Sequence, residues 1–488
     1  MPGNFNCLLI HPEFSKKSSL NYADVCRIAG AKYPMPPLGL LTVAALLPGN
    51  WNYKLIDLNT TPLQGKDFEW ADIVCTGGML SQQPGIIEII RKAHEYGLKV
   101  VAGGPDPSCQ PDLYSGADYL VIGEGENTIP LFLDDLNRGV KKGVYLTEAP
   151  VDLTRSVIPR YDLIHFSDYL VMGMQFSRGC PYNCEFCNVI EIFGRKQRTK
   201  TVDQIITELQ TLFNLGYKGH IFFVDDNFLA QGNSVEELLN SIAEWSEKNK
   251  YPFYFQAESS LNFASKDMFL QLLKKAEFRY LSIGIETPED RVLRKAQKHQ
   301  NMNNSIHSSV KKILSYGIIV DASFILGFDN ETELSAGFMM NCIGDSGICM
   351  AMVGTLYALP GTQLARRLKK EGRLFQDVTR IRNNSMEIDQ MTSGLNFLTN
   401  RPRSEILRDY SSILSYIYNP ENYYRRLTYL GLNLKPCYRY KPGINKKIRL
   451  WISFVKVCGI VGFNVRTGLL FWKLLLTMLL KNPKALEP

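Results

Sequence analysis

The most informative part of this chain is a short stretch that carries three cysteines: Ser177-Arg178-Gly179-Cys180-Pro181-Tyr182-Asn183-Cys184-Glu185-Phe186-Cys187. The spacing Cys-x-x-x-Cys-x-x-Cys places three thiolates on one tight loop. Such a loop suits three corners of a cubic iron–sulfur cluster and leaves the fourth iron without a protein ligand. An open iron can bind a small molecule, whereas a fourth cysteine would close the cluster for electron transfer only. The spacing therefore predicts a 4Fe-4S cluster on Cys180, Cys184 and Cys187.

Two other interpretations of these cysteines fit less well. A structural zinc site normally takes four ligands, often as two short-spaced pairs, and the nearest histidine in the sequence is His165. Disulfides pair an even number of cysteines, and the N-terminal residues lack the pattern of an export signal. The remaining cysteines are scattered, which is typical of small buried apolar residues in a reducing, cytoplasmic compartment.

Length and charge limit how the chain can be organised. With 488 residues, of which 45% are hydrophobic and 21% charged, the composition is that of a folded enzyme with two or three domains. The formal charge is +7, but the segment from Lys435 to Pro488 alone holds eleven Lys/Arg and one acid, so the rest of the chain is slightly negative. This asymmetry argues against a nucleic-acid surface and indicates a local role for the C-terminal tail.

Residues 1–150 alternate short apolar runs with helical patterns, which predicts an α/β domain with a doubly wound parallel sheet. The strand-like runs are Cys7–Ile10, Tyr53–Ile56, Asp72–Cys75, Lys99–Ala102 and Tyr119–Ile122. Ligands of such sheets bind at the carboxyl ends of the strands. Those ends carry three glycine-rich turns: Thr76-Gly77-Gly78, Gly103-Gly104-Pro105 and Gly123-Glu124. Because glycine permits tight turns and close approach of the backbone, we expect a large ligand at this edge.

After a linker at residues 151–168, six strand-like runs alternate with helical patterns: Met172–Phe176, His220–Val224, Phe253–Gln256, Tyr280–Ile285, Ile318–Leu326 and Met350–Leu356. Six βα units over residues 169–360 predict a partial (β/α)6 TIM-type barrel, with its chemistry at the carboxyl ends of the strands. The cysteine loop follows the first of these strands. Residues 361–440 are predicted to form a mainly helical C-terminal domain.

The tail at residues 441–488 is both apolar and basic. Its apolar residues between Ile448 and Leu480 are interrupted by Lys456, Arg466 and Lys473, so no uncharged run reaches the ~18–20 residues that span a bilayer. We expect two amphipathic helices that lie in a membrane interface, with Lys and Arg reaching toward anionic head groups. The alternative is that these helices close the barrel or pack on another subunit.

The cysteine motif resembles that of the radical S-adenosylmethionine (SAM) superfamily, and the domain order resembles the subfamily in which a cobalamin-binding domain precedes the barrel. Several segments resemble the hopanoid C-2 methylases: Pro36-Pro37-Leu38-Gly39-Leu40, Gly103-Gly104-Pro105, Phe223-Val224-Asp225-Asp226-Asn227-Phe228 and Gly284-Ile285-Glu286-Thr287-Pro288. One departure concerns the Asp-x-His-x-x-Gly motif, which supplies a lower axial histidine in other cobalamin proteins. It is absent, and His11 does not complete it.

The resemblance implies roles for individual residues. The three cysteines would bind the cluster, whose open iron would hold SAM. Phe186 and Ile325 would pack near the adenine of SAM, Asp225 or Asp226 would meet its ammonium group, and Glu286 would bind the ribose. The cobalamin site would comprise Thr76, Gly77, Gly78, Gly103, Gly104, Pro105, Gly123 and Glu124. The residues themselves leave alternatives open, since Phe186 and Ile325 also suit core packing and an Asp-Asp-Asn run also suits helix capping.

The implied function is methylation of an unactivated carbon in a hydrophobic, hopanoid-like membrane lipid, using the 4Fe-4S cluster, SAM and cobalamin. Electrons would come from an external donor such as flavodoxin or ferredoxin. Two alternatives are a radical SAM enzyme that couples or cyclises a lipid or tetrapyrrole without methyl transfer, and a non-catalytic, membrane-docked iron–sulfur protein that binds SAM. The expected location is the cytoplasm, with peripheral contact through the tail at the inner face of the cell membrane.

Overall fold

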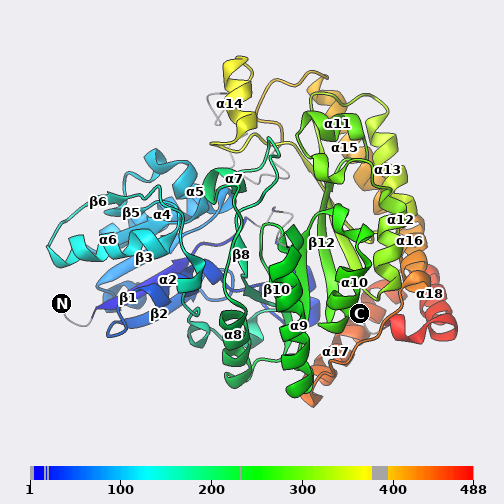
Figure 1. Ribbon diagram of the computed structural model, residues 1–488, viewed down its shortest axis with the longest axis horizontal. Coiled ribbons are helices and arrows are strands. Elements are labelled where there is room, and N and C mark those ends of the chain that lie inside the picture. The colour runs from blue at the N-terminus through cyan, green and yellow to red at the C-terminus, as the bar shows by residue number, and fades with distance from the viewer. Residues whose placement is uncertain (1–4, 16–17, 19–20, 231, 376–393, 487–488) are drawn as a thin grey trace.

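The computed structural model describes residues 5–15, 18, 21–230, 232–375 and 394–486. In these residues two six-stranded parallel sheets lie beside each other, and helices of the C-terminal part cover the far side of the second sheet (Figure 1). This is the predicted α/β architecture of a doubly wound sheet followed by a partial barrel. The domain boundaries proposed from the sequence remain predictions.

The N-terminal sheet has the order β2-β1-β3-β4-β5-β6, with all neighbours parallel. Its strands are β1 (Asn6–His11), β2 (Asn52–Asp57), β3 (Ile73–Gly77), β4 (Lys99–Gly103), β5 (Tyr119–Val121) and β6 (Gly143–Tyr145). Cys7 and Leu9 pack into one apolar cluster while Leu8 and Ile10 pack into another, because successive side chains of a strand point to opposite faces. The sheet is therefore buried on both faces. The sequence did not predict β6, because Gly143-Val144-Tyr145 is not a run of buried apolar residues.

Helices cover both faces of this sheet. They are α2 (Leu38–Leu46), α3 (Gly65–Trp70), α4 (Gln83–Glu95), α5 (Pro105–Cys109) and α6 (Gly125–Asn137), whereas α1 (Ala23–Ala29) packs against the C-terminal helix α17 (Ile444–Val457). The predicted linker at residues 151–168 is not loose, since Val151, Leu153 and Tyr161 are buried.

The second sheet has the order β14-β13-β12-β11-β10-β7 and is also parallel throughout. Its strands are β7 (Met172–Met174), β10 (Gly219–Phe223), β11 (Phe253–Ser259), β12 (Phe278–Glu286), β13 (Ile319–Leu326) and β14 (Met350–Thr355). All six lie where the sequence predicted strands. The helices that pack outside them are α8 (Val202–Asn214), α9 (Gly232–Lys248), α10 (Asp267–Lys275), α11 (Asp290–Lys295), α12 (Ile306–Ser315) and α13 (Ser335–Ser346).

The first barrel strand is shorter than predicted. After Met174 the chain leaves the sheet, because the backbone N–H groups of Phe176 and Ser177 donate to the carboxylate of Asp225 rather than to a neighbouring strand. The cysteine loop then extends between two short antiparallel strands, β8 (Ser177–Arg178) and β9 (Arg198–Thr199), and contains α7 (Val189–Ile192). The loop is therefore held at its base by its own small ribbon.

The C-terminal part is helical, as predicted. Its helices are α14 (Gln363–Lys370), α15 (Arg403–Ile417), α16 (Pro420–Asn433), α17 (Ile444–Val457) and α18 (Gly468–Lys481). A π-helical turn at Cys458–Gly462 follows α17 and lies between it and α18. Residues 376–393 of the predicted helical domain lie outside the described residues. Of the helices that are described, none has the length and apolar character needed to cross a bilayer.

Candidate active site

The three cysteines of the loop are free thiols in a largely buried setting. Burial, and then the proximity of Cys184, raises the pKa of Cys180 to about 11. The same two effects raise the pKa of Cys187 to about 12. Across the described residues, no three potential ligands are grouped tightly enough to hold a single metal ion. A cubic cluster differs because each thiolate binds its own iron, so the ligands spread farther apart. The donor set therefore fits a cluster better than a mononuclear zinc site.

Side chains from outside the loop fix its shape. Arg367 of α14 pairs with Glu185, its Nη2 lying 3.0 Å from Oε1. Gln300 donates to Sγ of Cys184 at 3.5 Å, a contact that tunes the reduction potential of a thiolate-bound cluster. Neither residue was predicted, and nothing in the sequence near Arg367 or Gln300 marks it as part of a site. Only the fold brings them to the cysteines.

The two adjacent aspartates after β10 have different environments. Asp225 is 1% exposed, and both of its oxygens accept hydrogen bonds from the segment that follows β7, including one from Phe176 N at 3.1 Å. Asp226 is half-buried and uses Oδ2 to accept the backbone N–H of Gly179 at 2.8 Å. Burial raises the pKa of Asp225 to about 7 and that of Asp226 to about 6. Asp225 is thus committed to the protein, whereas Asp226 keeps an oxygen for a ligand.

Glu286 ends β12 in a strained conformation. Its φ is +65°, a left-handed value that a side chain other than glycine rarely adopts, and the β12–β13 register shifts between Gly284 and Glu286. The carboxylate accepts a hydrogen bond from Lys298, whose ammonium lies 5.9 Å from the centre of the Phe186 ring. Burial acts to lower the pKa of Lys298, but the charges of Glu286 and Cys184 raise it above its ordinary value. Lys298 therefore links Glu286, the carboxylate predicted to bind the ribose, to Phe186 of the cysteine loop.

The two apolar residues predicted beside the adenine lie near this group. The ring of Phe186 meets that of Phe328 edge to face at 5.7 Å, and Ile325 of β13 is half-buried. Both side chains pack against the barrel core. Their contact with adenine remains a prediction.

Carboxyl groups that were not predicted from the sequence lie on the inner face of the barrel. Asp321 of β13 accepts from Ser282 at 2.8 Å, and Ser282 accepts from Gln256 at 2.8 Å. Water reaches the side chain of Glu258 at the end of β11. The surrounding protein nevertheless raises the pKa of Glu258 to about 7, and the charges of Asp321 and Asp226 contribute to this rise. A charged residue that ends an apolar strand was the available signal for Glu258. It is the same signal that identified Glu286.

The glycine-rich edge of the N-terminal sheet is shaped by close backbone contacts. A Cβ on Gly77 would lie 2.2 Å from the carbonyl oxygen of Gly103, and Gly104 has a φ of +97° with its Cβ position 3.1 Å from the nitrogen of Gly78. Gly123, with a φ of +79°, faces open space within 4 Å. Thr76 is buried and donates to Ile10 O at 2.9 Å. Two turns thus pack on each other while the third leaves room, an arrangement that fits a large planar ligand.

The same edge is tied to the cysteine loop by buried ion pairs. Glu124 lies 3.0 Å from Nη1 of Arg178 and 2.8 Å from Nη1 of Arg198, and Glu126 lies 2.7 Å from Nη2 of Arg178. Arg178 precedes the first cysteine by two residues. The predicted cobalamin edge and the predicted cluster loop are therefore neighbours in space.

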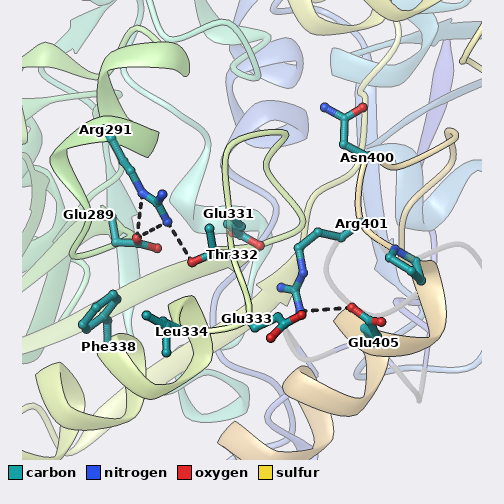
Figure 2. Close-up of a pocket in the computed structure, with 11 residues that line it drawn as sticks. Glu289, Arg291, Glu331, Thr332, Glu333, Leu334, Phe338, Asn400, Arg401 and Glu405 are labelled. Carbon is teal, nitrogen blue, oxygen red and sulfur yellow. Dashed lines mark hydrogen bonds and ion pairs between the residues drawn. The ribbon is translucent and has the colours of Figure 1, made fainter.

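A cavity with several charged residues in its lining lies elsewhere. It has a volume of about 700 Å³ and is lined by Glu289, Arg291, Glu331, Thr332, Glu333, Leu334, Phe338, Asn400, Arg401, Pro402 and Glu405. Figure 2 shows that its charged groups already face each other: Arg291 pairs with Glu289 at 2.7 Å, and Arg401 lies 3.7 Å from Glu405. The lining contains none of the predicted site residues. This cavity is not the predicted cofactor site.

Comparison with known families supports the interpretation of both sheets. Residues 25–133 match the B12 binding domain, residues 174–339 match the Radical SAM superfamily, and residues 362–488 match a domain of unknown function, DUF4070. These matches place cobalamin at the first sheet and the 4Fe-4S cluster and SAM at the barrel, so the chain uses all three cofactors.

Individual relatives share this organisation. An uncharacterized methyltransferase of Synechocystis sp. is 37% identical over 86% of this chain and 77% of its own length. The hopanoid C-2 methylase of Rhodopseudomonas palustris is 35% identical over 92% of this chain and 84% of its own. The radical SAM methyltransferase TsrM of Kitasatospora setae, solved with cobalamin and a 4Fe-4S cluster bound, shares the fold with a TM-score of 0.65 at 14% identity, over 93% of this chain and 99% of its own. The chain therefore belongs to the cobalamin-dependent radical SAM methyltransferases, in the group that contains the hopanoid C-2 methylases.

Proposed function

We propose that the enzyme methylates an unactivated carbon of a hydrophobic, hopanoid-like membrane lipid. The observation that carries this proposal is the buried junction of Glu124 and Glu126 with Arg178 and Arg198, because it sets the cobalamin edge directly against the cysteine loop. A methyl donor and a source of radicals must both reach one substrate carbon. The named activity of the Rhodopseudomonas relative supports the lipid class.

Within this proposal each residue of the chain has a defined task. Cys180, Cys184 and Cys187 hold the cluster. Asp226 rather than Asp225 accepts hydrogen bonds from the ammonium group of SAM, since Asp225 is saturated by backbone donors. Glu286, oriented by Lys298, accepts hydrogen bonds from the ribose. When bound, the cluster and SAM supply a radical that removes a hydrogen atom, and cobalamin supplies the methyl group.

We also propose that the tail docks on an anionic membrane surface. Many of its large apolar side chains are exposed, among them Trp451 at 65%, Phe463 at 80% and Leu469 at 83%. Arg466 and Lys473 lie exposed between them. Apolar area together with basic residues is typical of helices that lie in a bilayer interface. One face of α17 is already used, because Arg449 and Ser453 donate to carbonyls of α1, so the exposed residues belong to the outward face.

The decisive experiment uses the enzyme reconstituted with cluster and cobalamin. It is incubated without oxygen with a reductant, extracted membrane lipids and SAM that carries a deuterated methyl group. A lipid that gains the labelled methyl, together with 5′-deoxyadenosine, is the expected result. Formation of 5′-deoxyadenosine with an altered lipid that lacks the label would instead identify the coupling or cyclising alternative. Absence of 5′-deoxyadenosine under all conditions would identify the non-catalytic alternative.

A further inference from the structure

A second cavity lies along β14, the edge strand of the barrel sheet. It has a volume of about 490 Å³, within the roughly 300–1,000 Å³ that is usual for small-molecule sites. Its walls come from the N-terminal part, the edge strand and the C-terminal helices: Tyr22, Cys349, Met350, Ala351, Met352, Val353, Tyr410, Leu414, Tyr418 and Tyr423. The lining is apolar and aromatic, with tyrosine hydroxyl groups as its polar atoms.

The cavity adjoins the interior of the barrel. The hydroxyl of Tyr22 donates to Sδ of Met352 at 3.2 Å, and the hydroxyl of Tyr418 donates to the carbonyl of Ala351 at 3.0 Å. Burial raises the pKa of Tyr22, and the charge of Asp321 raises it further, so the inner-face carboxyl lies close to this wall. A molecule in the cavity would therefore lie beside the open edge of the barrel, next to the lumen that holds Asp321 and Glu258.

A buried cation stands behind the cavity wall. Arg426 of α16 is 0% exposed, and among the residues that the structure describes none accepts a hydrogen bond from its Nε, Nη1 or Nη2. Its guanidinium lies 5.6 Å from the centre of the Tyr423 ring. Its charge opposes the rise in pKa that burial imposes on Cys349 and Tyr418, which also line the cavity. A buried cation without an acceptor is strongly unfavourable, so the protein retains it against a substantial free-energy cost.

We propose that this cavity binds the lipid substrate as an amphiphile, with its apolar body along β14 and an oxygen-bearing group against the wall formed by Cys349, Tyr418 and Tyr423. This rests on the proposed function and names the part of the chain that selects the substrate. The apolar body contacts the Met352 and Leu414 side, while Arg426 supplies positive potential beside Tyr423, whose hydroxyl donates to the acceptor oxygen. An oxygen in this position offsets the isolated charge of Arg426.

The position of the cavity also suits a substrate that arrives from a membrane. Tyr22 immediately precedes α1, and α1 packs against α17. Tyr423 lies on α16, which packs against α18 through Gly431 and Met478. Two walls of the cavity are therefore in contact with the two helices whose apolar side chains are exposed. A lipid that leaves the bilayer beside α17 and α18 has a short path to β14.

The test uses three probes with one apolar body: butylpyrene, pyrenebutanol and pyrenebutanoate. Fluorescence anisotropy measures their binding to the full-length, reconstituted enzyme. We expect both oxygen-bearing probes to bind roughly tenfold more tightly than butylpyrene. Arg426→Met should remove that preference and leave the affinity for butylpyrene unchanged, while Arg426→Lys should retain part of it. Leu414→Trp should fill the cavity and weaken all three probes, whereas Leu407→Trp, at an exposed position of the same helix, should change none.

The outcomes separate this inference from the proposed function. Unchanged binding of all three probes in Leu414→Trp, or a full preference for oxygen in Arg426→Met, overturns the cavity assignment even if lipids are methylated. The predicted binding pattern, without transfer of a labelled methyl to any lipid, supports the cavity and overturns the methylase proposal. Iron content and the far-ultraviolet circular dichroism of each variant verify that it is folded. Arg426→Met should pass this check, because an apolar side chain replaces a buried charge for which the described part of the chain offers no acceptor.

Discussion

Arg178 donates from Nη2 to Oε1 of Glu126 at 2.7 Å, with side-chain exposures of only 11% and 10%. One residue belongs to the loop that carries the cysteines, and the other to the first turn of α6 at the edge of the N-terminal sheet. Because Glu124 and Arg198 join the same network, the pairing holds the two predicted cofactor sites in one fixed relation.

Breaking this junction should uncouple the two halves of the reaction. Arg178→Met leaves Glu126 without its partner, and the loss of one member of a buried pair lowers the free energy of unfolding by about 3 kcal/mol. We expect methyl transfer to fall more than 5′-deoxyadenosine formation, since radical generation needs only the barrel. Urea unfolding and parallel assays of both products measure this. Arg91→Met, which breaks an exposed pair with Glu88, is the control and should change stability by less than about 1 kcal/mol.

The two aspartates after β10 should respond differently to the same change. Asp226→Asn should weaken SAM binding by roughly tenfold or more, because it removes a charge-assisted contact to an ammonium group, with little effect on folding. Asp225→Asn should instead lower the free energy of unfolding by about 1–3 kcal/mol, since an amide nitrogen then faces backbone donors. Calorimetry with SAM and thermal unfolding compare the pair. Weaker SAM binding in Asp225→Asn, with lower stability in Asp226→Asn, would show that Asp225 contacts the ligand.

Removal of one cysteine ligand should abolish the cluster. Cys184→Ala should contain little iron and sulfide after anaerobic reconstitution, because two thiolates do not retain the cluster. Cys437→Ala is the matched control, since that cysteine is exposed and distant in sequence from the loop. Colorimetric iron and sulfide determination distinguishes them. Equal iron in both variants would refute the assignment of the loop.

The inner-face carboxyl at Glu258 should make stability depend on pH. The folded protein raises its pKa from the ordinary 4.5 to about 7, so the folded state binds more protons than the unfolded chain between these values. The free energy of unfolding therefore falls as the pH rises through this interval. Glu258→Gln should gain stability relative to the wild type across the interval and keep a constant advantage above it. Urea unfolding at several pH values should show this; a pH-independent difference would mean that Glu258 titrates normally.

The exposed tail should mediate attachment to vesicles. Replacing Phe463 and Leu469 by serine removes two side chains that are 80% and 83% exposed, and should reduce co-sedimentation with anionic vesicles several-fold. Leu146→Ser, which removes a 62% exposed leucine from the N-terminal part, should leave attachment unchanged. High salt should weaken the wild-type interaction if Arg466 and Lys473 contribute. Equal attachment of all three proteins would refute the membrane proposal.

Particular residues show how far sequence patterns reach. The strands of both sheets were predictable because buried parallel strands are short apolar runs with helices between them. β6 and the β8–β9 ribbon were not, because these short strands contain no run of buried apolar residues. The cysteine loop and Glu286 could be identified from spacing and from position after a strand. Arg367, Gln300 and Lys298 could not, because residues far apart in the sequence reach the loop only through tertiary packing.

The sequence by itself determined the chain's architecture and the residues predicted to hold its cluster, since these depend on local spacing and on strand and helix periodicity. Only the tertiary structure distinguishes Asp225 from Asp226, because it shows which carboxylate is already saturated by backbone donors. It alone showed that Glu124 and Glu126 meet Arg178, and that the buried Arg426 beside a cavity has no acceptor among the described residues. Burial and charge pairing are properties of contacts between distant segments, and local sequence does not encode them.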